Sequence, residues 1–219
     1  MKSLTFTPIR SLTLLTWLTS TCLFTTLSAR AQDSGFYFTG GIGPAIAEDI
    51  DVKEFLGFAG GKVKLDPGVG VSVAGGYNFN KFLGVEMETG FAANNIDSIA
   101  GNSPDALLYH VPFLANVVLR FDDEGSRIVP YVSAGVGGDS TLLWIDDSLG
   151  VDGSDSDVVF AFQLSAGVRF RINEKMSAGL SYKYYRADEA SWDVEDSAGR
   201  IKFGESTVHL IAAVFNMKF

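Results

Sequence analysis

The chain has 219 residues, of which 47% are hydrophobic, and it carries a formal net charge of −9. This acidic balance excludes the positively charged surface that binds nucleic acid, so we expect no nucleic-acid partner. The chain contains a single cysteine, Cys22, which excludes an internal disulfide. We expect no cofactor and no metal ion as a resident group.

Residues 1–31 have the features of a cleaved export signal. Lys2 and Arg10 precede or flank an apolar stretch rich in leucine, and Ala29-Arg30-Ala31 fits the small-x-small pattern of a cleavage site. Cleavage there would remove three cations and no acid, so the net charge would move to −12. Residues 32–219 would then form one domain without cysteine. An uncleaved membrane anchor is the alternative.

Alternation of apolar and polar residues predicts eight β-strands, and no later run of 18 apolar residues predicts a transmembrane helix. The clearest strand is 107–121, whose second face carries His110, Asn116 and Arg120. Pro112 removes a ladder donor from it, so we expect a bulge or local break there. The expected strands are 36–46, 69–79, 82–93, 107–121, 128–138, 158–171, 175–186 and 206–219.

The strand lengths favour a membrane barrel over a soluble sandwich. Several predicted strands alternate for 11 residues or more, whereas soluble strands average about 5–6 residues and bilayer-crossing strands about 9–11. In a barrel the apolar face meets lipid and the polar, glycine-rich face fills the lumen. Short turns at one end and long loops at the other fit this architecture. The expected long loops are 47–68, 94–106, 139–157 and 187–205.

The last predicted strand closes on an aromatic residue. Phe215, Met217 and Phe219 share one face, and Asn216 and Lys218 lie on the other. This pattern resembles the C-terminal signature of bacterial outer-membrane barrels, in which a terminal phenylalanine marks the chain for the assembly machinery. The resemblance assigns Phe219 as the assembly signal. An ordinary amphipathic edge strand is the alternative.

Three further segments, Tyr37–Gly43, Pro130–Gly137 and Ala166–Phe170, extend this resemblance to most of the chain. The chain resembles the small eight-stranded outer-membrane barrels, or opacity-like porins, which include the transmembrane domain of outer membrane protein A and its relatives X and W. The resemblance implies an all-β, antiparallel up-and-down barrel in the outer membrane of a bacterial cell. Outer-membrane lipid, lipopolysaccharide, periplasmic chaperones and the barrel-assembly machinery are the implied partners. Members include adhesins, membrane stabilisers, narrow pores and a few lipid-modifying enzymes.

Charged residues on the inward faces must pair, because side chains fill an eight-stranded barrel and buried charges need partners. We expect Arg120 to pair with Glu86 or Glu88 on the neighbouring strand, and Arg169 or Arg171 to reach the same acids across the lumen. A structural plug of ion pairs is the favoured interpretation, and a gate with exchangeable pairs is the alternative. The candidate lumen charge network is Glu86, Glu88, Arg120, Arg169, Arg171 and Lys183.

The acidic long loops are expected to face outward and to meet an extracellular partner. Trp144 and Trp192 are candidate loop anchors, because exposed aromatics concentrate binding energy, or they belong to the membrane belt. Alternate oxygen ligands in Asp152–Asp157 are a candidate for Ca²⁺, although the spacing lacks a hand-type loop, and a solvated acidic loop is the alternative.

Catalysis is not expected from the sequence. His110 has no serine two residues away, and His209 has no acid at that spacing. The favoured role is structural or surface-interaction, similar to that of an adhesin, with a charge-plugged lumen. A narrow passive pore for small solutes is the alternative, followed by a lipid-modifying enzyme.

Overall fold

Twelve β-strands make up the described part of the chain. The computed structural model describes residues 34–55, 60–99, 105–123, 125–145, 153–193 and 200–219, and the expected export signal lies outside them. The described residues contain no helix that is long and apolar enough to cross a membrane.

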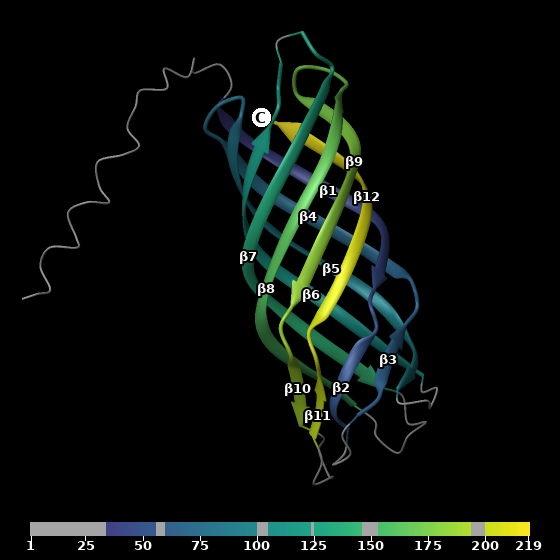
Figure 1. Cartoon of the computed structure of the whole chain (residues 1–219). Helices are drawn as coiled ribbons and strands as arrows, with labels where there is room; N and C mark the ends of the chain where they lie inside the picture. Colours follow the sequence, from purple (N-terminus) through teal and green to yellow (C-terminus); the bar gives the residue numbers. More distant parts are fainter. Residues whose placement is uncertain (1–33, 56–59, 100–104, 124, 146–152, 194–199) are drawn as a thin grey trace, which may run out of the picture. The chain divides into compact units, whose positions relative to one another are not determined.

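Eight of these strands form a closed antiparallel barrel (Figure 1). Each pairs with the next along the wall, and β12 pairs with β1, which closes the sheet. The predicted all-β, eight-stranded up-and-down barrel is therefore confirmed. The barrel strands are β1 (Gly35–Ala47), β4 (Gly68–Asn78), β5 (Leu83–Ile99), β6 (Ala106–Arg120), β7 (Ile128–Ile145), β8 (Gly153–Arg171), β9 (Met176–Ala187) and β12 (Ser206–Lys218).

Four short strands extend the wall at the end opposite the C-terminus (Figure 1). They are β2 (Ile50–Phe55), β3 (Lys62–Leu65), β10 (Ala190–Asp193) and β11 (Arg200–Phe203). β3 pairs with the outer end of β5, β2 joins β3 to β11, and β11 pairs with β10. We call these four strands the extension. The prediction of plain loops at 47–68 and 187–205 was wrong for these residues.

The barrel strands β5, β7 and β8 also continue into the regions predicted as loops. Residues 153–157, part of the candidate calcium segment, form the outer end of β8, and Asp152 lies outside the described residues. Asp157 accepts a hydrogen bond from the backbone N–H of Ser191 at 2.9 Å, which fixes β10 against the barrel wall. The segment is therefore strand where it is described, and its one described carboxylate already has a backbone partner.

The apolar faces of the barrel strands point outward, as the alternation predicts. Met87 is 67% exposed and Phe113 is 58% exposed, whereas Glu88 and Leu114, their neighbours in sequence, are buried inside. An exposed apolar band around a closed sheet is the arrangement that a bilayer stabilises.

Two prolines interrupt the barrel ladders without changing the register. The β5–β6 pairing omits Pro112 and Val111 and resumes in the same register at His110. The β1–β12 pairing likewise omits Pro44 and Gly43. Proline has no N–H to donate, so each ladder loses contact locally. The expected local break at Pro112 is present, and it is not accompanied by a bulge.

The inner face of the extension forms an apolar core at the outer end of the barrel, which we call the cap. Trp192 is 2% exposed, contacts Phe203 edge-to-face, and donates its indole N–H to the carbonyl of Thr141 at 3.2 Å. Its expected role as an exposed anchor is therefore wrong, whereas Trp144 remains 39% exposed. The cap consists of Ile50, Val52, Val63, Ile96, Ile99, Ala106, Leu108, Leu143, Ala190, Trp192, Ile201 and Phe203.

Substitution of Gly43 tests the closing seam. A Cβ at Gly43 would lie 1.9 Å from the carbonyl oxygen of Ile211 in β12, so Gly43→Ala must push β1 and β12 apart. We expect a loss of about 1–3 kcal/mol in the free energy of unfolding. The urea midpoint, followed by the gel mobility of unboiled samples, measures it. Gly75→Ala is the matched control, because its Cβ meets nothing within 4 Å, and equal midpoints for the two variants would contradict the seam geometry.

Candidate functional site

Strand β6 crosses every level of the lumen and shows what fills it. Its inward residues are buried from one end to the other, except Pro112, which is half-buried. They alternate in kind between apolar and polar, so the lumen is divided into levels of different chemistry. In order from the long-loop end, these residues are Leu108, His110, Leu114, Asn116, Val118 and Arg120.

The level nearest the short turns is rich in arginine. Arg120 donates to the carbonyl of Asn80 at 2.9 Å, and in the described part of the chain no ion pair joins it to Glu86 or Glu88. This differs from the expected pairing, because backbone carbonyls of the turn at the end of the lumen accept hydrogen bonds from the guanidinium instead. The Arg120 guanidinium lies over the aromatic ring of Tyr37, with its carbon 5.7 Å from the ring centroid.

The other two arginines also find local partners. The Arg169 guanidinium stacks over the Tyr131 ring at 4.2 Å, and its Nη2 lies 3.9 Å from Glu86 Oε1. Arg171 bonds Asp122 in the neighbouring turn at 2.6 Å rather than a lumen acid. The expectation that one of the two reaches a lumen glutamate therefore agrees with the position of Arg169.

The middle level is a polar network around Glu88. Lys183 forms an ion pair with Glu88 Oε1 and donates to Ser72 at 3.1 Å. Glu88 Oε2 accepts from Gln163 at 2.9 Å and from Asn116 at 3.2 Å, and Gln163 also donates to Asn116 at 2.7 Å. Residues from β4, β5, β6, β8 and β9 thus meet across the lumen. The buried carboxylate has a cation and two amide donors, which is what charge burial requires.

An apolar level separates this network from the outer end. Leu114, Ala161 and Ala212 are fully buried in it, and Tyr185 and Leu210 pack beside them. The polar atom of this cluster is the Tyr185 hydroxyl, which is buried without a hydrogen-bond partner in the described part of the chain. An ion that moved along the lumen would lose its water here and would meet little besides this hydroxyl to replace it.

The level above contains a histidine held between an acid and a serine. His110 Nδ1 lies 2.6 Å from Asp139 Oδ2, and Ser206 Oγ lies 2.9 Å from His110 Nε2. Thr141 donates to the same Asp139 oxygen at 2.7 Å. The sequence argument missed Ser206 because it looked along one strand, whereas this serine comes from β12, 96 positions away. No sequence signal short of the barrel register would have brought them together.

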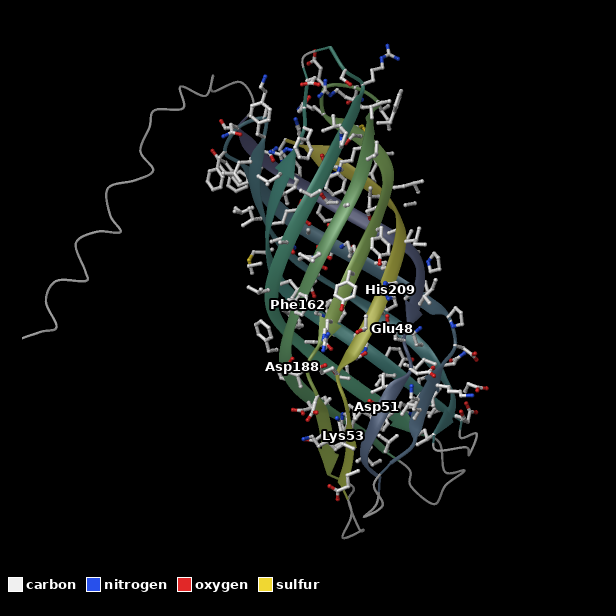
Figure 2. The ribbon with its side chains drawn as sticks, in the orientation of Figure 1. Glu48, Asp51, Lys53, Phe162, Asp188 and His209 are labelled. Carbon is white, nitrogen blue, oxygen red and sulfur yellow. The ribbon has the colours of Figure 1, made fainter. Side chains whose placement is uncertain are left out.

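The second histidine lies on the outer wall. His209 accepts or donates through Nδ1 to the Tyr182 hydroxyl at 2.7 Å, and its Nε2 lies 3.0 Å from Glu48 Oε1 (Figure 2). Glu48 follows β1 and so was not found by spacing along β12. This outward cluster joins β9, β12 and the segment after β1 at the level where the extension begins.

In the described part of the chain, small cavities lie at three levels of the lumen. One of about 30 Å³ opens near the short turns, and one of about 20 Å³ lies beside Glu88 and Lys183; Arg169 lines both. A third, of about 10 Å³, lies under the cap beside His110 and Ser206. Among the described residues, no group of three or more histidine, cysteine or acidic side chains is placed to hold a metal ion.

Comparison with known proteins agrees with this architecture. Residues 18–211 match the family described as outer membrane protein beta-barrel domain, and no curated protein matches. Two similar structures are Neisserial surface protein A (18% identity, 85% of this chain and 99% of that one, TM-score 0.56) and OprG from Pseudomonas aeruginosa (17%, 85% and 97%, TM-score 0.59). At these identities the similarity concerns the fold. The matched region covers most of the chain, which therefore belongs to the outer membrane protein β-barrel family and resides in the bacterial outer membrane.

Proposed function

We propose that this protein is a sealed outer-membrane scaffold with a structural or surface-interaction role, which presents its extension outside the cell. The observation that carries the proposal is the succession of closed levels inside the barrel. A buried ion-pair network, an apolar level and an apolar cap follow one another along the lumen. A passive pore would require all three to open together.

The energetics of the Glu88 network support a plug over a gate. Separating Lys183 from Glu88 would leave two buried charges without counter-charges, and breaking one buried pair costs about 3–5 kcal/mol. Water would also have to enter the apolar level around Leu114. Spontaneous opening would therefore be rare, and a steady conductance would not be expected.

The outer face of the extension offers an ordered surface to a partner. Glu189 on the β9–β10 connection pairs with Lys202 at 2.8 Å and with Lys53 at 3.6 Å, and Lys53 lies on the outer side of the extension (Figure 2). The hydrogen bond from Lys202 holds the pKa of Glu189 below its ordinary value. These pairs join β2, β11 and the β9–β10 connection across the outer surface.

The route to this location is also part of the proposal. Residues 1–31 would direct export and be cleaved, and Phe219 would mark the chain for the barrel-assembly machinery after periplasmic chaperones have carried it. Lipopolysaccharide and phospholipid would then surround the apolar band. An extracellular partner would meet the extension and the long loops.

Conductance in a planar bilayer tests the sealed lumen. Protein isolated from outer membranes, whose mobility on a gel changes on boiling, is expected to insert without producing current steps. The variant Glu88→Gln/Leu114→Ser, which removes the charge pair and places a hydroxyl in the apolar level, is expected to conduct in a larger fraction of insertions. Reproducible steps from the unaltered protein would contradict the plug and favour the narrow pore.

Removal of the buried carboxylate is expected to destabilise the barrel. Glu88→Gln leaves Lys183 buried without a counter-charge, so the free energy of unfolding should fall by about 3 kcal/mol. Glu88→Gln/Lys183→Met should recover most of that loss, because the buried charge is removed as well. Urea unfolding in lipid vesicles measures both variants.

Glu189→Gln on the surface is the matched control for this series, and it is expected to change the urea midpoint little because exposed ion pairs contribute weakly. A midpoint for Glu88→Gln as high as that of the control would show that the Glu88 network does not hold the barrel together.

A further inference from the structure

The outermost polar level of the lumen has the connectivity of a nucleophile, a base and an orienting acid. Ser206 on β12 lies 2.9 Å from His110 Nε2 on β6, and His110 Nδ1 lies 2.6 Å from Asp139 on β7. All three side chains are buried. Three strands of a rigid barrel therefore fix the geometry, and no loop has to move to form these contacts.

The acid favours one tautomer of the neutral imidazole. Asp139 Oδ2 accepts from Thr141 and lies against His110 Nδ1. With the imidazole proton on Nδ1, that proton is donated to Asp139, and Nε2 can accept from the Ser206 hydroxyl. An acid that orients a histidine, which in turn accepts the proton of a serine, is the arrangement that activates serine for attack on a carbonyl.

We propose that Ser206 is a base-activated nucleophile for acyl transfer, and that its substrate class is the ester of an apolar acyl chain. The activity goes beyond the scaffold role, and neither depends on the other. Other lumen serines lack this environment in the described part of the barrel. Ser133 and Ser165 bond to each other at 2.5 Å, and the hydroxyl of Ser181 is buried without a partner.

The surroundings of Ser206 favour an apolar substrate. In the closed cap the cavity beside it is small, about 10 Å³, and is lined on its outer side by cap residues, among them Leu108, Trp192 and Phe203. When the cap opens, an acyl chain could replace the apolar contacts that these side chains make with each other in the closed cap. The site lies at the end of the barrel that carries the extension, on the side of the outer leaflet.

Access requires the cap to move. β10 is fastened to the barrel by the bond from Ser191 to Asp157 and by that from Trp192 to the carbonyl of Thr141. Displacement of Trp192 would open the cavity to Ser206 and would free an indole N–H beside it. We therefore expect slow turnover, because this donor is occupied until the cap opens and does not form a ready oxyanion site.

The reaction balances with water as the second reactant. The Ser206 oxygen bonds to the ester carbonyl carbon while its proton passes to His110 Nε2. The ester C–O bond then breaks, and the leaving alcohol takes that proton. Water attacks the acyl-serine with His110 as base, and the products are a carboxylic acid and the original serine.

Covalent labelling with a fluorophosphonate tests the proposal. The probe phosphonylates an activated serine with loss of fluoride, and mass spectrometry locates it. Folded protein from outer membranes should carry the label on Ser206, and Trp192→Ala should label faster because the cap is loosened. Ser206→Ala should carry none there, and His110→Gln should label at least about a hundredfold more slowly, since a general base contributes that much.

Ser181→Ala is the matched control, since it removes a buried lumen serine that has no base, and its labelling should equal that of the unaltered protein. Absence of label on Ser206 in both the unaltered protein and Trp192→Ala, with the barrel shown to be folded by its gel mobility, would overturn the proposal. Equal labelling in His110→Gln would also overturn it. Current steps in a bilayer would refute the sealed scaffold without affecting this result.

Discussion

Each backbone N–H and C=O group that the chain carries into the membrane must find its partner within the chain, because lipid offers none. Closure of the sheet by the β1–β12 pairing satisfies this requirement for the backbone. The same pairing is the one that Gly43 and Pro44 weaken locally, and the close approach to Ile211 at that point leaves no room for a side chain. The seam is thus the condition for the closed barrel and one of the places where the wall leaves no room for a side chain.

The same requirement explains the lumen. Eight strands leave space for side chains only, and the inward residues must then satisfy one another. Lys183 and Glu88 do so with help from Asn116 and Gln163, and His110 does so with Asp139. Apolar residues separate these levels. A filled barrel of this kind gains stability from the contacts between its interior side chains.

The alternation of residues was enough to predict the eight barrel strands, their faces and the polar lumen. The extension was not predicted, since strands of four to six residues with charged outer faces read as loops and their partners lie far away in sequence. The cap was missed for the same reason, because its side chains come from these short strands. Trp192 was therefore assigned to the surface, although it is buried.

Side-chain partners across the lumen were the least predictable feature. Which glutamate Lys183 contacts depends on strand tilt and stagger, and these two residues are 95 positions apart. Arg120 was assigned to a glutamate on a neighbouring strand, but turn carbonyls reach it instead. Ser206 and His110 meet through the register of three strands, which alternation within any one strand does not contain.

Thiol labelling from outside the cell tests the sealed barrel most directly, because it measures whether a water-soluble reagent can enter the lumen. The only cysteine, Cys22, lies in the segment expected to be removed. An introduced cysteine would therefore be the one thiol that the reagent can label in the mature protein. Lys53→Cys on the extension should react with a membrane-impermeant thiol reagent on intact cells. Ser165→Cys, inside the barrel next to Ser133, should react only after unfolding. Reaction of Ser165→Cys at the rate of Lys53→Cys would show an open lumen and contradict the account.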